Sequence, residues 1–111
     1  MKEESQQTVG YIYGIKNNLN GRWYVGQTKR HVNIRWQEHR DGLVEGRHHS
    51  YKLQHDFNSK GLSQFDWIVL EEVKGIKGET GSDTLTAREK HWCDKLLGIK
   101  KGYNVLPPGE K

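Results

Sequence analysis

Two short segments rich in β-branched and aromatic residues constrain the fold of this chain most strongly. The first is residues 8–16, TVGYIYGIK, and the second is residues 22–28, RWYVGQT, with the polar segment NNLNG between them. β-branched and aromatic side chains favour extended backbone, whereas Asn and Gly favour tight turns. The pattern therefore predicts a β-hairpin.

The register of this hairpin decides which tyrosines lie together. A turn centred on residues 18–19 places Tyr13 directly opposite Tyr24, and a two-residue turn at residues 20–21 shifts the pairing along the strands. Because side chains alternate between the two faces of a strand, both registers leave Tyr13 and Tyr24 on one face. Such an aromatic pair is also an ordinary way to stabilise a sheet, so it does not by itself indicate a site.

Helical spacing follows over residues 31–46, HVNIRWQEHRDGLVEG, where Gly42 is expected to end the helix. Arg35 and His39 project from the same stripe as Trp36. Two cationic groups one turn apart repel each other when both are charged, so their place on a buried stripe fits a bound anion. A structural alternative stays open, in which the arginine stem covers Trp36 and the histidine binds a backbone carbonyl.

Three further elements are expected along the chain. Ser50 is predicted to cap a second helix that ends near Gly61. Residues 65–73, FDWIVLEEV, have the composition of a third strand, and the Gly-rich residues 74–83 are predicted to form a surface loop. A last helical stripe contains Leu85, Arg88, Glu89, Trp92 and Leu96.

The elements follow the order β-β-α-α-β-α. This order is typical of an α/β sandwich of the α+β type, here a small, mainly antiparallel three-stranded sheet flanked by helices. Gly102 is expected to break the last helix, and residues 103–106 to add a short extended piece. The length of 111 residues fits one domain, with residues 1–7 and 107–111 as flexible tails. Only 32% of the residues are hydrophobic, but four Trp and five Tyr supply apolar area for a core.

Charge and cysteine content narrow the class of protein. Residues 10–60 carry nine basic side chains against four acidic ones, which indicates either a polyanion-binding face or an ordinary solvated surface. No apolar run is long enough to cross a bilayer, and the N-terminal residues MKEESQQTVG lack the apolar stretch of a secretion signal. The single cysteine, Cys93, cannot form an internal disulfide. We therefore expect a cytoplasmic protein.

Glu89 is the most informative residue of the last helix, because it lies on the face that should be buried. A buried carboxylate needs a partner or a ligand. Two structural explanations stay open at this point. Thr86 and Glu89 match the T-x-x-E pattern of a capping box, and Arg88 is a neighbouring candidate for an ion pair.

Taken together, these residues resemble the GIY-YIG nuclease family, over residues 10–106. The two half-motifs of the family match residues 11–13, YIY, and residues 24–26, YVG. Its catalytic arginine, a histidine one turn later, its metal-binding glutamate and a C-terminal asparagine correspond to Arg35, His39, Glu89 and Asn104. The segments between them look especially similar to the catalytic domains of phage-type homing endonucleases.

Two positions depart from the family pattern. Tyr11 stands where the first half-motif has its leading glycine, and Gly10 precedes it. Some relatives carry a lysine soon after the second half-motif, whereas this chain has Gln27 there and Lys29 two residues later. The first departure concerns the geometry of the strand, and the second leaves the role of that lysine absent or shifted.

The resemblance implies a divalent-metal-dependent endonuclease that hydrolyses DNA phosphodiester bonds. Glu89 would hold Mg²⁺, with Mn²⁺ able to substitute, and Arg35 would neutralise charge on the phosphate. Tyr13 is the first choice for the general base, and Tyr24 or His39 would position or relay protons. The contacts to the substrate would come from four further residues, His48, Lys29, Arg30 and Asn104. The adjacent His49 leaves open which imidazole binds the phosphate, and Asn104 would orient a loop or a tyrosine or have a purely structural role.

The implied partner is DNA, double-stranded, without any membrane association. The resemblance also implies a phage or bacterial host cell, and it leaves open a protein partner or a separate DNA-recognition region. Two other functions compete with the nuclease. One is a catalytically silent nucleic-acid-binding module on the same scaffold. The other is a structural zinc domain that uses His48, His49, His55 and Cys93, and it is disfavoured because these residues lack regular ligand spacing.

Overall fold

A computed structural model describes residues 7–75, 81–96 and 102–104 of the chain. The elements are β1 (Gln7–Asn17), β2 (Trp23–Thr28), α1 (Val32–Val44), α2 (Tyr51–Lys60), β3 (Phe65–Gly75) and α3 (Gly81–Lys95). Their order, and the three-stranded sheet in which both pairings are antiparallel, confirm the predicted fold class. No helix within the described residues has both the length and the apolar character of a membrane span.

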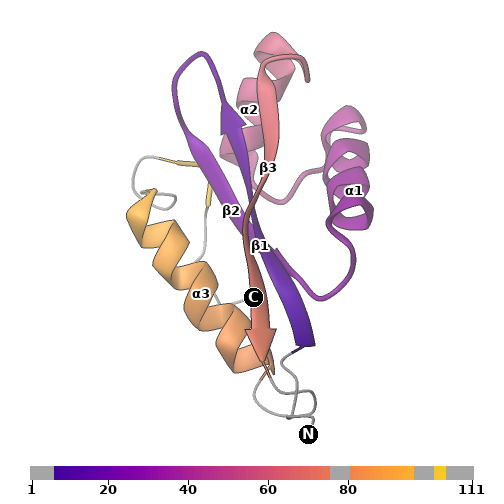
Figure 1. Ribbon diagram of the computed structural model, residues 1–111. Coiled ribbons are helices and arrows are strands. Elements are labelled where there is room, and N and C mark those ends of the chain that lie inside the picture. The colour runs from indigo at the N-terminus through magenta and orange to yellow at the C-terminus, as the bar shows by residue number, and fades with distance from the viewer. Residues whose placement is uncertain (1–6, 76–80, 97–101, 105–111) are drawn as a thin grey trace, which may run out of the picture.

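The sheet has the strand order β2-β1-β3, so β1 lies in the centre, and helices cover both of its faces (Figure 1). One core cluster joins Tyr13, Ile15 and Tyr24 of the hairpin to the helices α1 and α2. A second cluster on the opposite face joins Ile12 and Val25 to α3. The alternation of side chains along the central strand thus divides the core into two layers.

The hairpin places both tyrosines on one face, as predicted, and this face is covered by α1 and α2. Neither of the two expected registers forms. Tyr13 pairs with Gly26, and Tyr24 pairs with Ile15. The reason is the turn, in which the backbone N–H of Asn17 donates to the carbonyl oxygen of Arg22 at 2.9 Å. This bond leaves a loop of residues 18–21, longer than either turn that the sequence suggested.

Gly21 and Asn17 explain why this longer loop forms. Gly21 has a φ of 76°, a conformation that glycine adopts without strain. Its N–H donates to the carbonyl of Asn17 at 2.8 Å, and the side-chain oxygen of Asn17 accepts from the N–H of Leu19 at 2.8 Å. An Asn side chain that binds the backbone two residues on is a common turn device.

The new register puts Tyr13 over Gly26. A Cβ added at Gly26 would lie 2.4 Å from the Tyr13 hydroxyl oxygen, so only glycine leaves room for this ring. Gly10 is crowded in a similar way, since a Cβ added there would lie 2.6 Å from the carbonyl oxygen of Thr28. Gly10 therefore serves close packing of the hairpin, while its neighbour Tyr11 pairs with Thr28 on β2.

The boundaries of α1 and α2 are set by caps. Gly42 does not end α1, which continues to Val44, and Gly46 with a φ of 76° follows the helix instead. The predictions for α2 are confirmed. The hydroxyl of Ser50 accepts from the N–H of Leu53, and Gly61 with a φ of 88° follows the last turn.

The predicted loop at residues 74–83 is shorter than expected, because its first two residues belong to β3 and its last three to α3. Residues 76–80 lie outside the described residues. The helix therefore begins well before Thr86, and the capping-box explanation for Glu89 is wrong. Gln7, expected in a flexible tail, begins β1, and the rest of both expected tails lies outside the described residues.

Residues 102–104 attach to the free edge of β2. The N–H of Tyr103 donates to the carbonyl of Trp23 at 2.9 Å. The amide of Asn104 accepts from the N–H of Val25 at 2.9 Å and donates to its carbonyl at 2.8 Å. No strand forms over Tyr103 and Asn104, contrary to the predicted extended piece, and the rest of that piece lies outside the described residues.

Candidate active site

The two tyrosines of the hairpin present their hydroxyls to histidines. Tyr13 is 1% exposed and Tyr24 is 5% exposed. The Tyr13 hydroxyl lies 2.6 Å from Nε2 of His39 on α1. The Tyr24 hydroxyl lies 2.7 Å from Nε2 of His49, in the loop between α1 and α2. Each phenol thus has its own imidazole partner.

The histidines form a cluster of their own. Nδ1 of His39 lies 2.6 Å from Nε2 of His48, and Nδ1 of His48 accepts the N–H of Ser50 at 3.0 Å. The rings of His48 and His49 stack with their centroids 4.5 Å apart. The sequence suggested His49 only as an alternative to His48 for a phosphate contact, and its bond to Tyr24 was not predicted.

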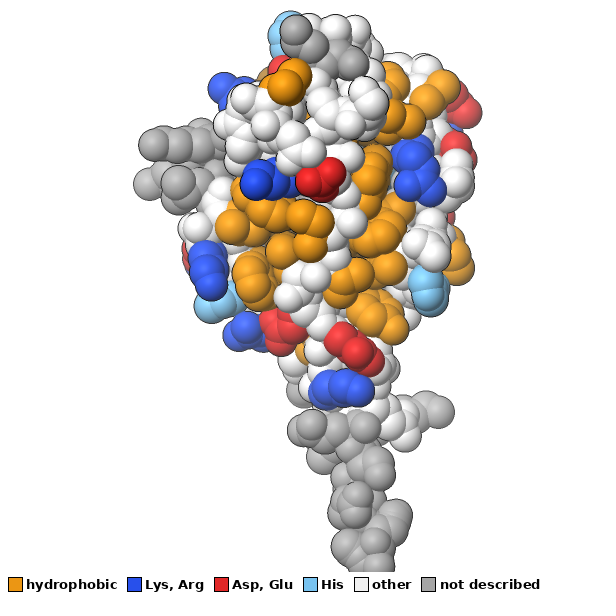
Figure 2. All heavy atoms as spheres, turned by 45° about the horizontal axis from the view of Figure 1, so that its top comes forward, with side chains coloured by type: hydrophobic (Ala, Val, Ile, Leu, Met, Phe, Trp, Pro, Cys, Tyr) orange, Lys and Arg blue, Asp and Glu red, His pale blue; other side chains and the backbone are white. Residues whose placement is uncertain are grey.

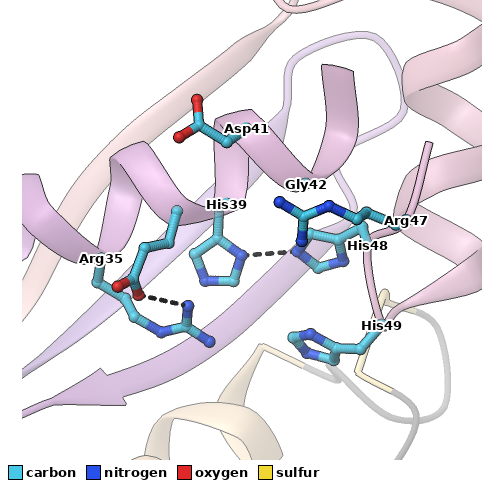
Figure 3. A pocket seen from close by; sticks show the side chains of 8 residues that line it. Arg35, His39, Asp41, Gly42, Arg47, His48 and His49 are labelled. Carbon is cyan, nitrogen blue, oxygen red and sulfur yellow. Dashed lines mark hydrogen bonds and ion pairs between the residues drawn. The ribbon is translucent and has the colours of Figure 1, made fainter. Parts of the chain in front are cut away.

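A pocket of about 370 Å³ opens beside this cluster (Figure 3). Figure 3 shows the side chains of Arg35, His39, His48 and His49 around it, below α1. Its lining consists of Arg35, Glu38, His39, Asp41, Gly42, Arg47, His48 and His49. The guanidinium groups of Arg35 and Arg47 give this pocket donors of the kind that an anion requires, beside the carboxylates of Glu38 and Asp41.

Arg35 shares the carboxylate of Glu38 with Arg30. Nη1 of Arg35 lies 3.1 Å from Oε1 of Glu38, and Nη2 of Arg30 lies 2.7 Å from the same oxygen. The two guanidinium groups hold the pKa of Glu38 below its usual value, Arg30 contributing most through its hydrogen bond. Glu38 therefore stays charged and holds Arg35 in the lining of the pocket, while Arg30 is bonded to the same carboxylate.

Glu89 comes from α3 and is 3% exposed. Its Oε1 accepts from Nε2 of Gln27 on β2 at 2.7 Å. Arg88 does not form the suspected ion pair with Glu89, because it binds Glu71 of β3 at 2.8 Å. The carboxylate of Glu89 is therefore oriented by a neutral amide.

The charges of Arg35 and Glu89 act on both tyrosines. Burial, the largest cause, raises the pKa of Tyr13 well above its usual value, and the neighbouring Tyr24 and Glu89 raise it further. The pKa of Tyr24 is raised by burial first and by Glu89 as well. Arg35 lowers both. The two phenols, the guanidinium and the carboxylate thus belong to one electrostatic environment, and burial keeps both phenols neutral.

His48 is neutral at physiological pH. Burial, followed by the charges of His49 and Arg35, lowers its pKa to about 4. Both of its ring nitrogens are bonded within the protein, to Ser50 and to His39. The structure therefore does not support the predicted contact between His48 and the substrate.

The other predicted substrate contacts have different fates. Asn104 is 5% exposed and its amide is bonded to the backbone of β2, so the structure gives it a structural place in the fold. Arg30 is bonded to Glu38 of the pocket lining, and 52% of its side chain is exposed. Lys29 is exposed beside Arg30 at the end of β2.

Whether Glu89 suits a metal ion depends on how many protein ligands that ion requires. In the described part of the chain, no group of three or more His, Cys, Asp and Glu residues is arranged to hold a metal. The suggested zinc set of His48, His49, His55 and Cys93 thus lacks the convergence that a structural zinc site requires. Mg²⁺ needs only one or two protein carboxylates and keeps its waters, so the donor chemistry of Glu89 fits it.

Comparison with known proteins identifies the class. Residues 9–104 match the model of the GIY-YIG catalytic domain. Since this match covers most of the chain, the chain belongs to the GIY-YIG family.

Curated relatives narrow the identification further. The chain is 39% identical over 94 residues to intron-associated endonuclease 1 of Enterobacteria phage T4, an alignment that covers 85% of this chain and 36% of that protein. It is 36% identical over 67 residues to the uncharacterized protein 019R of Invertebrate iridescent virus 6, covering 60% of this chain and 23% of that protein. The chain therefore spans well under half the length of either relative.

Solved structures agree with this result. A mutant of the catalytic domain of intron endonuclease I-TevI has a TM-score of 0.77 and 34% identity, covering 93% of this chain and 96% of that chain. The catalytic domain of homing endonuclease I-TevI has a TM-score of 0.76 and 35% identity, covering 87% and 98%. The chain is a GIY-YIG endonuclease domain with the fold of a homing endonuclease catalytic domain.

Proposed function

We propose that this chain is a divalent-metal-dependent endonuclease that hydrolyses phosphodiester bonds of double-stranded DNA. The observation that carries the proposal is that the buried hydroxyls of Tyr13 and Tyr24 bind His39 and His49, which line one pocket with Arg35. The charges of Arg35 and of Glu89 on α3 also shift the pKa of both phenols. Hydrolysis of a phosphodiester needs positive charge on the phosphate, a base for the attacking water and stabilisation of the leaving oxygen. These groups supply the required chemistry, and the endonucleases that resemble this chain support the reaction class.

Glu89 would hold the divalent cation, Mg²⁺ or Mn²⁺, through its carboxylate. When bound, the cation supplies positive charge to the scissile phosphate and to the leaving 3′ oxygen. Gln27 fixes the orientation of the carboxylate through its bond to Oε1. A hydrogen bond of this kind to a ligating carboxylate is a usual part of a metal site.

Tyr13 is proposed as the base, because its hydroxyl oxygen lies 2.6 Å from Nε2 of the buried His39. The positive charge of Arg35 also lowers the pKa of Tyr13. These groups and the cation together oppose burial and favour the phenolate, whose proton has left to solvent. The phenolate takes a proton from water as the water oxygen attacks phosphorus and the bond to the 3′ oxygen breaks.

Arg35 is proposed to bind the non-bridging phosphate oxygens. In the free protein it shares Glu38 with Arg30. Solvent screens an exposed ion pair of this kind, so Arg35 can exchange it for a phosphate. Arg30 then keeps the carboxylate of Glu38 neutralised.

Cleavage of supercoiled plasmid DNA tests the proposed activity. With Mg²⁺ or Mn²⁺ we expect nicked or linear products, and with an excess of chelator we expect none. DNA that is bound in a gel-shift assay but never cleaved with either ion would instead identify a silent nucleic-acid-binding module.

The face drawn in Figure 2 shows no concentration of basic side chains. On that face, Lys and Arg side chains lie singly among hydrophobic and acidic ones (Figure 2). The pocket beside α1 instead brings Arg35 and Arg47 together with three histidines, and its two carboxylates, Glu38 and Asp41, lie in the same lining. We therefore propose that DNA approaches from the side of α1 and the loop that follows it.

The affinity for DNA is expected to fall steeply with salt. Each phosphate that the protein neutralises releases counterions, so the binding constant should decrease at least about tenfold between about 50 and about 200 mM salt. Fluorescence anisotropy of a labelled duplex across a salt series measures this slope. A flat response would contradict an electrostatic DNA surface.

A further inference from the structure

The hydrogen bonds that link Ser50, His48, His39 and Tyr13 have a defined direction. This series of hydrogen bonds begins at the backbone N–H of Ser50, which lies 3.0 Å from Nδ1 of His48. A backbone N–H can only donate, so Nδ1 of His48 carries no proton. The neutral ring of His48 must then carry its proton on Nε2.

This assignment passes on to the next two groups. Nε2 of His48 lies 2.6 Å from Nδ1 of His39, so His48 donates and His39 accepts. The neutral ring of His39 then carries its own proton on Nε2, which lies 2.6 Å from the Tyr13 oxygen. His39 is 1% exposed and Tyr13 is 1% exposed, so solvent does not compete for these bonds.

We infer that His48 is a positioning residue, which acts through His39 to hold the Tyr13 oxygen as a hydrogen-bond acceptor. The inference rests on the proposed role of Tyr13 as the base. A donor from His39 stabilises the phenolate and leaves its remaining lone pairs for the attacking water. This series of hydrogen bonds cannot carry the Tyr13 proton away, because the backbone N–H of Ser50 at its other end cannot accept a proton.

The local loop makes this role testable, because two substitutions separate the functions of the two His48 nitrogens. In His48→Asn, the side-chain oxygen can still accept from the N–H of Ser50, but the shorter side chain does not reach His39. In His48→Gln, the longer amide reaches the place of Nε2 and can donate to His39. The first variant keeps the turn and breaks the link, and the second restores the link.

The primary measurement is the ¹⁵N spectrum of the histidine rings, which distinguishes the two neutral tautomers without any cleavage assay. In the wild-type chain we expect His39 to carry its proton on Nε2. This state should persist in His48→Gln and become mixed in His48→Asn. A wild-type His39 protonated on Nδ1 would overturn the inference.

The second measurement is the rate of single-turnover cleavage. We expect His48→Asn to lower the rate at least about tenfold with unchanged DNA affinity and melting temperature, as for other groups that orient a catalytic residue. His48→Gln should recover most of the loss. Equal rates in the wild type and in His48→Asn would overturn the inference. If no variant cleaves, the wild type included, the proposed function fails while the tautomer of His39 still decides the inference.

Discussion

Replacement of Glu89 by alanine or glutamine is expected to abolish cleavage, with a loss of at least about a thousandfold, while DNA affinity changes little. The physical reason is that Glu89 is the proposed ligand of the cation, and a neutral side chain at this position binds a divalent cation far more weakly than a carboxylate. Without the cation, charge on the leaving oxygen is not stabilised. Glu89→Gln is the sharper variant, because its amide oxygen can still accept from Gln27 and the helix should keep its packing.

Glu71 provides the matched control. This carboxylate also faces α3, where it accepts from Arg88 at 2.8 Å and from Trp92 at 2.9 Å. Glu71→Gln removes the same charge and retains an acceptor, so we expect nearly wild-type cleavage. Initial rates of plasmid nicking compare the two variants, and nicking retained in Glu89→Gln would refute the metal-binding role.

The second large effect is expected at Arg35. Arg35→Ala should lower the cleavage rate by about a hundredfold or more, because loss of one group that stabilises transition-state charge has this order of effect. Binding of DNA should weaken much less. Arg35→Lys keeps the charge but not the forked geometry, so it should recover only part of the rate.

Arg40 is the control on the same helix. Its guanidinium lies 5.2 Å from the centre of the Trp67 ring and not in the pocket. Arg40→Ala therefore removes one positive charge of α1 without touching the proposed site, and the rate should change little. Single-turnover rates at saturating enzyme make the comparison, and an unchanged rate in Arg35→Ala would assign Arg35 to packing.

Much of the fold could be predicted because it depends on local sequence patterns. Ser50 and Gly61 mark the ends of α2, and alternation in the hairpin puts Tyr13 and Tyr24 on one face. The register could not be predicted, because it depends on a turn in which Asn17 supplies both backbone and side-chain bonds. Turns of two and of four residues both fit this segment, and the hydrogen bonds that decide between them are visible only in the folded structure.

The candidate site was predicted less completely than the fold. Tyr13, Arg35, His39 and Glu89 stood out as polar groups on faces that should be buried, and the structure places them in one electrostatic environment. His49 was missed as a partner of Tyr24, because the loop that carries it has no periodicity. His48 was expected to contact the substrate, whereas its Nδ1 accepts from the backbone N–H of the neighbouring Ser50.

Paramagnetic relaxation by Mn²⁺ tests the central claim most directly, namely that the two phenols, Arg35 and Glu89 surround one cation site. Addition of Mn²⁺ to the wild-type chain should first broaden the NMR signals of the Tyr13 and Tyr24 rings. The signals of Tyr51, an exposed residue of α2, should be affected later. In Glu89→Gln the selective broadening should disappear. Broadening that is centred elsewhere, or that survives this substitution, would contradict the account.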